Sequence, residues 1–259
     1  GAAVATVIGQ IIAAILALVF NLKCNRELNI SMKGFRPNGY LIVQIYKVGA
    51  PSIVVQAIGS LMTYGMNLIL AAFGSAQTVF GIYFKLQSFV FMPVFGLNNG
   101  MVPIIAYNYG AGHKDRVIKT IKHSVAYGVG IMFVGLLAMH IFPAQLMRMF
   151  DAEESLIAIG APALETISLS FVFAGFCIVA GSVFQALGNG VYSMIVSVAR
   201  QMCVLLPVAK LLSLSGEVTL IWWAFPIAEL ASVLLTSYFL VRIYRKVICH
   251  IGEPVVQDA

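Results

Sequence analysis

Residues 2–22 have the sequence AAVATVIGQIIAAILALVFNL, a run without a single charged side chain. At about 1.5 Å of rise per residue, a helix of this length crosses the roughly 30 Å hydrocarbon core of a bilayer. Further apolar runs follow at residues 48–73, 79–108, 118–142, 156–187, 191–213 and 218–244. We therefore predict an all-α, polytopic bundle with seven transmembrane spans.

The composition agrees with a protein whose surface faces lipid. The 259-residue chain is 60% hydrophobic and 10% charged, with a mean hydropathy of +0.94. Soluble domains carry about 25% charged residues, because a compact core needs a polar surface to cover it. This excludes most soluble folds. The cysteines, at Cys24, Cys177, Cys203 and Cys249, are far apart in the sequence and indicate neither a disulfide scaffold nor a metal centre.

Sequence motifs typical of enzymes are absent. The chain has no HExxH or GxSxG pattern, no phosphate-binding GxxxxGKS/T pattern and no pair of intramembrane aspartates. We therefore expect no catalytic residue, no metal and no cofactor.

The distribution of Lys and Arg predicts the orientation in the membrane, because cytoplasmic loops retain these residues. The formal net charge is +6. Most of the positive charge lies in residues 23–47, 114–122 and 242–246. The intervening loops are neutral or acidic, at residues 74–77, 143–155 and 214–217. This alternation places residue 1 outside and the C-terminus in the cytoplasm, and it explains the basic character without a nucleic-acid partner.

Glu229 is the most unusual polar residue, because it lies near the centre of the last apolar run. An ionised carboxylate there is costly unless it is paired or hydrated, so the side chain should face the bundle or a water-filled cavity. Two interpretations stay open. Glu229 either attracts a proton or another cation, or it forms a hydrogen bond to a neighbouring helix that serves packing.

Two further charged residues lie inside apolar runs. Glu165 is about a third of the way into residues 156–187 and is a second candidate for attracting an ion or a substrate. Arg200 lies roughly 13 Å along the helix predicted for residues 191–213. It either pairs with an acid or extends its guanidinium to the lipid headgroups, and we favour the second interpretation.

Amide side chains are candidates for lining a pathway, since an amide both donates and accepts hydrogen bonds. These candidates are Gln56, Asn67, Gln87, Asn98 and Gln185. Hydrogen bonding between helices explains each of them equally well.

Prolines and glycines inside the runs predict local helix geometry. Proline frees backbone carbonyls and bends helices, which moving transporters use. The candidates for such bends are Pro51, Pro93, Pro207 and Pro226. The GxxxG pattern at Gly96 and Gly100 predicts the close approach of two helices.

Several stretches resemble one transporter family. Residues 91–97 (FMPVFGL) and 103–112 (PIIAYNYGAG) are similar to the eighth helix of multidrug and toxic compound extrusion (MATE) transporters and the loop after it. Other similar stretches occur in the family's order, at residues 1–10, 48–52, 184–189, 200–207 and 222–229. The resemblance covers the chain to about residue 246.

The resemblance implies a domain organisation, because MATE transporters have twelve helices in two lobes. Residues 1–22 then correspond to the last helix of the N-terminal lobe and 23–47 to a cytoplasmic interlobe linker. Residues 48–246 correspond to the six-helix C-terminal lobe, and 247–259 to a cytoplasmic tail. The chain begins inside an apolar helix without an initiator Met, which indicates a fragment whose partner is the missing N-terminal lobe.

The resemblance also implies secondary active efflux. Such transporters exchange cationic amphipathic drugs for protons or sodium by alternating access, and here we expect this activity in a bacterial inner membrane. One branch places acidic cation ligands in the seventh and tenth helices. The corresponding helices of this chain carry Gln56, Gly59 and Phe176, so sodium coupling through that pair is not expected.

Two alternative functions stay open. A lipid-linked oligosaccharide flippase of the same superfamily would favour a more basic central cavity, which holds pyrophosphate. A membrane remnant that does not transport would lack an N-terminal lobe in the native reading frame.

Overall fold

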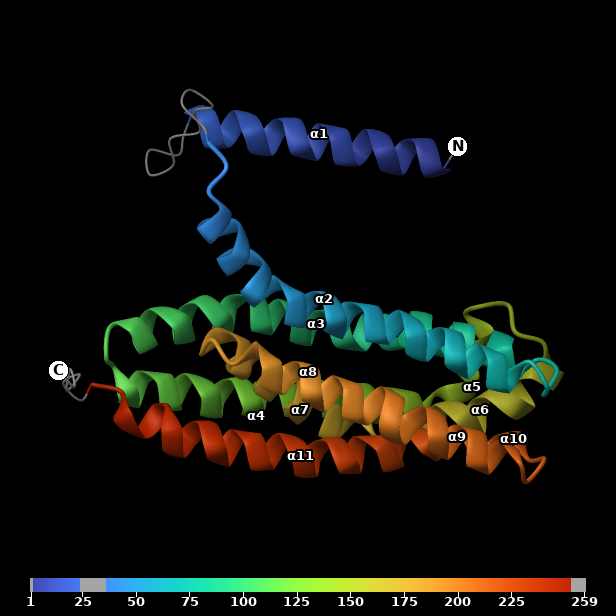
Figure 1. Ribbon diagram of the computed structural model, residues 1–259. Helices are drawn as coiled ribbons and strands as arrows, with labels where there is room; N and C mark the ends of the chain where they lie inside the picture. Colours follow the sequence, from blue (N-terminus) through green and yellow to red (C-terminus); the bar gives the residue numbers. More distant parts are fainter. Residues whose placement is uncertain (1, 24–35, 253–259) are drawn as a thin grey trace. The chain divides into compact units, whose positions relative to one another are not determined.

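The computed structural model of the chain describes residues 2–23 and 36–252 (Figure 1). The described part divides into two units, Gly1–Ile45 and Tyr46–Ala259. Residues 24–35 of the predicted interlobe linker and residues 253–259 of the predicted tail lie outside the described residues.

The first unit contains α1 (Ala2–Lys23). Its side chains from Val4 to Phe20 are exposed, as expected of an apolar helix that faces lipid. The unit also contains the start of α2 (Gly39–Leu70). This helix begins before residue 48 because Asn38 caps it: the Asn38 side-chain oxygen accepts a hydrogen bond from the Tyr40 backbone nitrogen at 3.0 Å.

The second unit holds the remaining elements. They are α3 (Ala76–Gly110), α4 (Lys114–Ile141), α5 (Pro143–Arg148), α6 (Glu154–Ser168), α7 (Phe171–Ala186), α8 (Gly190–Val198), the π-helix η1 (Ala199–Leu205), α9 (Leu206–Ser213), α10 (Val218–Ile221), α11 (Ala224–Lys246) and the 3-10 helix η2 (Ile248–His250).

The predicted fold class is confirmed. Within the described residues, six helical segments are long and apolar enough to cross a membrane, and α6 with α7 makes a seventh span that is bent by 49°. Among these, α8, η1 and α9 form one continuous span, and α10, α11 and η2 form another. The bend between α6 and α7 follows Ser168.

Helix α7 lies at the centre of the second unit, where it packs against α3, α4, α8 and α11 (Figure 1). Glycine permits its close approach to α4: a Cβ on Gly175 would lie 2.9 Å from the Gly128 carbonyl oxygen. The prediction that Gly96 and Gly100 bring helices together is wrong for the part of the chain that the structure describes. There, a Cβ on either glycine would meet no atom within 4 Å.

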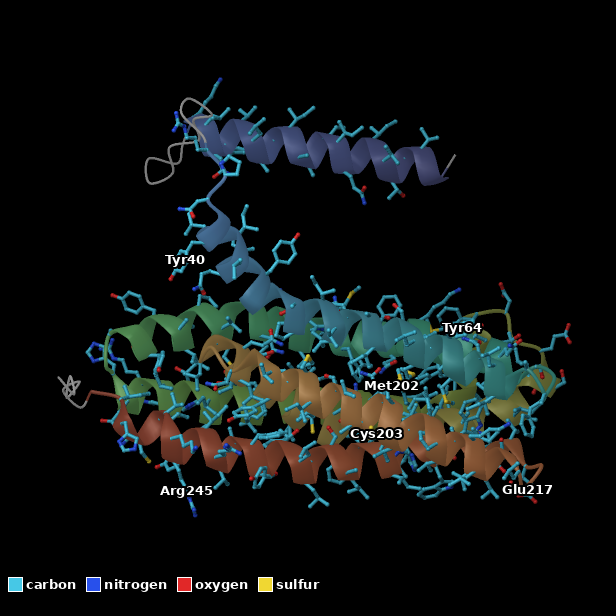
Figure 2. The ribbon with its side chains drawn as sticks, viewed as in Figure 1. Tyr40, Tyr64, Met202, Cys203, Glu217 and Arg245 are labelled. Atoms are coloured by element: carbon cyan, nitrogen blue, oxygen red, sulfur yellow. The ribbon has the colours of Figure 1, made fainter. Side chains whose placement is uncertain are left out.

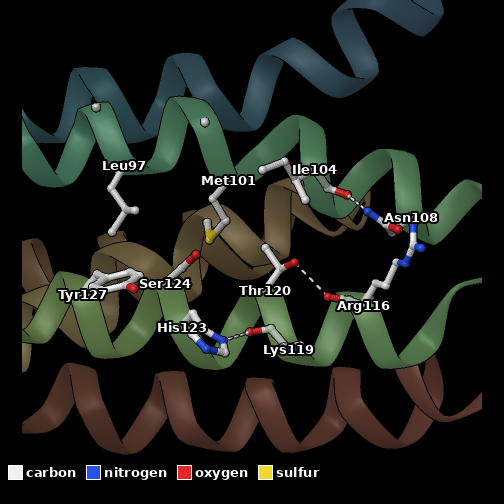
Figure 3. A pocket seen from close by; sticks show the side chains of 12 residues that line it. Leu97, Met101, Ile104, Asn108, Arg116, Lys119, Thr120, His123, Ser124 and Tyr127 are labelled. Carbon is white, nitrogen blue, oxygen red and sulfur yellow. Dashed lines mark hydrogen bonds between the residues drawn. The ribbon is translucent and has the colours of Figure 1, made fainter.

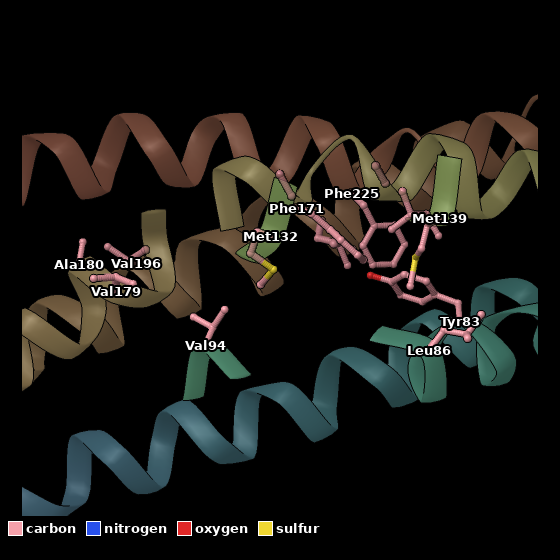
Figure 4. Close-up of a cluster of buried hydrophobic side chains, with 14 of the residues drawn as sticks. Tyr83, Leu86, Val94, Met132, Met139, Phe171, Val179, Ala180, Val196 and Phe225 are labelled. Atoms are coloured by element: carbon pink, nitrogen blue, oxygen red, sulfur yellow. The ribbon is translucent and has the colours of Figure 1, made fainter. Parts of the chain in front are cut away.

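A cluster of aromatic side chains fixes the start of α11 against α3. Phe80 lies 6.5 Å from Trp222 and 6.1 Å from Phe225, measured between ring centroids. Tyr83 lies 5.8 Å from Phe225 in an edge-to-face arrangement, and both rings are labelled in Figure 4. Because Glu229 follows Phe225 by four residues, it lies on the same buried face of α11.

One end of the second unit is basic. Lys114 donates a hydrogen bond to the Cys249 carbonyl oxygen at 2.8 Å, which joins the start of α4 to η2, directly after α11. The loops α2–α3 and α9–α10 lie at the opposite end (Figure 1). The two basic segments at residues 114–122 and 242–246 therefore share one side of the bundle.

Candidate functional site

The described spans contain a partly buried ion pair. The Arg200 guanidinium Nη1 donates a hydrogen bond to the Glu229 carboxylate Oε2 at 3.0 Å. The Glu229 side chain is 6% exposed and that of Arg200 is 32% exposed. The pair joins two neighbouring spans, and the two charges neutralise each other where an isolated charge would be costly.

Arg200 lies on the widened turn of η1. There, the Leu206 backbone nitrogen donates to the Gln201 carbonyl oxygen, a step of five residues instead of four. Pro207 follows directly, and it has no N–H to donate to the Cys203 carbonyl, which its ring also crowds. The sequence thus favours irregular helix geometry at this point. Turns of this kind are frequent at functional sites.

A polar strip on α11 extends from the ion pair. Glu229, Ser232 and Thr236 are all buried and follow the spacing of one helix face. Ser232 donates a hydrogen bond to the Cys177 sulfur of α7 at 3.4 Å. The Thr236 hydroxyl oxygen has no hydrogen-bond partner in the described structure. We missed this strip in the sequence, although the three- and four-residue spacing of its members was visible there.

The structure decides between the two interpretations of Arg200. Our prediction that its guanidinium reaches the lipid headgroups is wrong, because it pairs with Glu229. Glu229 does bond to a neighbouring span, as one of its two interpretations expected. Its attraction of a proton or another cation stays a prediction.

Glu165 is half-buried on α6. Two ion pairs occur within residues 2–23 and 36–252, namely Arg200 with Glu229 and the exposed Arg148 with Glu154. Glu165 belongs to neither of them. The role of Glu165 in attracting an ion or a substrate therefore stays a prediction.

The amide candidates are dispersed. Asn98 is buried and its Oδ1 has no hydrogen-bond partner among the described residues. Asn67 donates to the Thr63 carbonyl oxygen of its own helix at 2.9 Å. Gln87 is half-buried, whereas Gln56 and Gln185 are exposed. Their role in lining a pathway stays a prediction.

The proline candidates occupy different helix positions. Pro51 and Pro93 lie inside α2 and α3, while Pro207 and Pro226 lie in the first turns of α9 and α11. The measured bend of 49° lies between α6 and α7, away from all four. Bending at the four prolines stays a prediction.

Known protein sequences similar to this chain are multidrug transporters. A family model described as MatE matches residues 51–211. The multidrug export protein MepA of Staphylococcus aureus (strain bovine RF122 / ET3-1) is 27% identical over 231 residues, which cover 88% of this chain and 51% of MepA. MepA of Staphylococcus haemolyticus (strain JCSC1435) is 26% identical over 247 residues, which cover 95% of this chain and 54% of that protein.

Solved structures show the same fold. The MATE multidrug transporter DinF-BH superposes with a TM-score of 0.82 and 33% identity, and the match covers 96% of this chain and 56% of that one. The chain thus spans about half the length of the curated relatives it matches.

Proposed function

The chain belongs to the MatE family, and from this premise we propose that it forms the C-terminal part of a multidrug efflux transporter. Members of the family are transporters, and the curated relatives are multidrug export proteins. The proposed substrates are cationic amphipathic compounds, which leave the cell in exchange for protons or sodium ions. The proposed partner is an N-terminal lobe of the same protein.

The chain is an integral membrane protein, and we place it in a bacterial inner membrane with its C-terminus in the cytoplasm. Support for this orientation comes from the contact of Lys114 with the Cys249 carbonyl. That contact brings two basic segments to one side of the bundle, as expected when cytoplasmic loops retain Lys and Arg.

The observation that carries the proposed mechanism is the Arg200–Glu229 pair. A cation or proton that binds Glu229 competes with the Arg200 guanidinium for the same carboxylate. Binding therefore favours an arrangement of the spans in which the pair is open. A ligand drives a conformational cycle only through such a difference in affinity between states. Glu165 is the second residue that we propose attracts an ion or a substrate.

The flippase alternative receives less support from this site. Pyrophosphate requires cations that are free to bind it, whereas the Arg200 guanidinium is already paired with a carboxylate at 3.0 Å. The pair therefore presents little net positive charge to a phosphate group.

Transport by the full-length gene product in proteoliposomes tests the proposal. A fluorescent lipophilic cation is loaded, and a proton gradient or a sodium gradient is imposed separately. We expect dye movement to follow one of the two gradients and to stop when that gradient is collapsed. Dye movement that neither gradient alters, in vesicles shown to contain folded protein, would overturn the proposal.

A further inference from the structure

A cavity of about 610 Å³ lies between α3 and α4, and neither Arg200 nor Glu229 lines it (Figure 3). Its floor is apolar. Gly96 and Gly100 line it, and a Cβ on either would meet no atom of the described residues within 4 Å. Leu97, Met101 and Ile104 add apolar walls. The missing side chains of the two glycines therefore leave space for hydrocarbon.

One end of the same cavity is positively charged. Arg116 and Lys119 line it from α4, and both are exposed. Neither forms an ion pair within residues 36–252. The only acid close to them in sequence is Asp115, which lines a smaller neighbouring cavity together with Lys114 and Arg116. The local charge is therefore positive, which disfavours a cationic occupant and favours an anionic one.

An unsatisfied acceptor lies at this charged end. Asn108 is 7% exposed and lines the cavity. Its amide nitrogen donates to the Ile104 carbonyl oxygen at 2.8 Å, whereas its Oδ1 has no hydrogen-bond partner among the described residues. Figure 3 shows this amide beside Arg116. A buried acceptor without a partner is costly, so a hydrogen-bond donor on the occupant would be favourable here.

The length of the cavity fits one leaflet of a bilayer. Its α4 side runs from Arg116 to Tyr127, a distance of about 16 Å along the helix axis. This is close to half of the roughly 30 Å hydrocarbon core. Because α4 begins at Lys114, the charged end lies at the membrane surface and the glycine floor lies deeper.

We propose that this groove binds an anionic glycerophospholipid whose headgroup carries hydroxyl donors, such as phosphatidylglycerol. The phosphate lies between Arg116 and Lys119, a headgroup hydroxyl donates to the Asn108 Oδ1, and an acyl chain covers Gly96 and Gly100. The proposal does not depend on the transported substrate, and it assigns the groove a ligand of the opposite charge.

Native mass spectrometry of the full-length protein in detergent, titrated with dioleoyl lipids, tests the proposal. We expect phosphatidylglycerol to bind about tenfold more tightly than phosphatidylcholine. The variant R116Q/K119Q should bind phosphatidylglycerol roughly 30-fold more weakly, because it removes two surface charges and each contributes about fivefold to the affinity for an anionic lipid. The control K122Q removes an exposed charge of the same helix outside the groove and should bind like the wild type.

Two further variants test the glycine floor and the Asn108 acceptor separately. Gly100→Leu fills the floor and should reduce phosphatidylglycerol binding, whereas Gly130→Leu, at a position equally free of neighbours within 4 Å, should not. Asn108→Leu should remove the preference for phosphatidylglycerol over phosphatidic acid, whose headgroup has no glycerol hydroxyls. Thermal unfolding checks that each variant is folded.

Equal binding of phosphatidylglycerol and phosphatidylcholine to the wild type would overturn the proposal. Equal affinities of R116Q/K119Q and K122Q would do the same. Full competition by millimolar inorganic phosphate, with no effect of Gly100→Leu, would indicate an anion site instead of a lipid groove and would also overturn it.

Discussion

Arg200 and Glu229 lie 29 positions apart in the sequence and meet through a hydrogen bond of 3.0 Å. The contact links the widened turn of η1 to the buried face of α11. The Arg200 side chain is partly exposed, while the Glu229 side chain is almost fully enclosed. A charge change at either residue therefore affects two spans at once.

Replacing Glu229 with Gln should lower the free energy of unfolding by about 1–3 kcal/mol, because it leaves the Arg200 charge without its partner. The loss is smaller than for a fully enclosed pair, since the Arg200 side chain is 32% exposed. Unfolding in detergent measures it. The double variant R200Q/E229Q should recover part of the loss, and strict additivity of the two single effects would contradict coupling.

The exposed Arg148–Glu154 pair provides a matched comparison. Its side chains are 60% and 79% exposed, and exposed pairs contribute about 0–1 kcal/mol. Glu154→Gln should therefore change the midpoint of unfolding much less than Glu229→Gln. Equal effects would mean that burial does not determine the contribution of the Arg200–Glu229 pair.

Adding one methyl group at Gly175 should destabilise the bundle by about 1–3 kcal/mol. The new Cβ would lie 2.9 Å from the Gly128 carbonyl oxygen, and this backbone atom cannot move without separating α4 from α7. Gly130→Ala is the control, because it meets open space and raises helix propensity. The two variants should shift the melting temperature in opposite directions, and a stabilised Gly175→Ala would refute the close approach.

The two tryptophans should differ strongly in their contribution to stability. Trp222 is 0% exposed and Trp223 is 46% exposed. Trp222→Ala should lower the free energy of unfolding by about 3–5 kcal/mol, because it removes a buried ring and leaves a cavity in the aromatic cluster. Trp223→Ala should lower it by less than about 1 kcal/mol. Equal melting temperatures of the two variants would be inconsistent with the packing of α10 and α11.

Cysteine labelling in intact cells should report the orientation. In a cysteine-free background of the full-length protein, Ser215→Cys should react with a membrane-impermeant maleimide. His113→Cys should react only after the membrane is opened, because it adjoins the basic end of the bundle. Both positions are exposed in loops at opposite ends. The reverse labelling pattern would place the basic end outside.

The number and type of spans could be predicted from the sequence, because continuous apolar runs of about 20 residues are what a transmembrane helix requires. The start of α2 could not, since an apolar run does not show the cap that Asn38 provides. The break between α6 and α7 was also missed, because residues 166–170 contain no glycine, proline or charged residue that would predict it.

The site could be predicted only in part. Glu229 was identifiable because a charge in an apolar run requires compensation. Its partner depends on how two distant spans pack, which the sequence of either span does not show. Gly96 and Gly100 show the same limit. A GxxxG spacing creates a smooth surface, but only the surrounding helices decide whether that surface contacts a helix or faces a groove.

Efflux of a lipophilic cation by cells that express the full-length protein tests the central claim most directly. The comparison includes the wild type, Glu229→Gln, Arg200→Gln and Glu154→Gln at equal protein levels in the membrane. The account predicts that Glu229→Gln and Arg200→Gln reduce the efflux rate about tenfold or more, which corresponds to a rise of about 1.4 kcal/mol in activation free energy. Glu154→Gln should keep the wild-type efflux rate. Efflux by Glu229→Gln at the wild-type rate would contradict the claim that the pair takes part in transport.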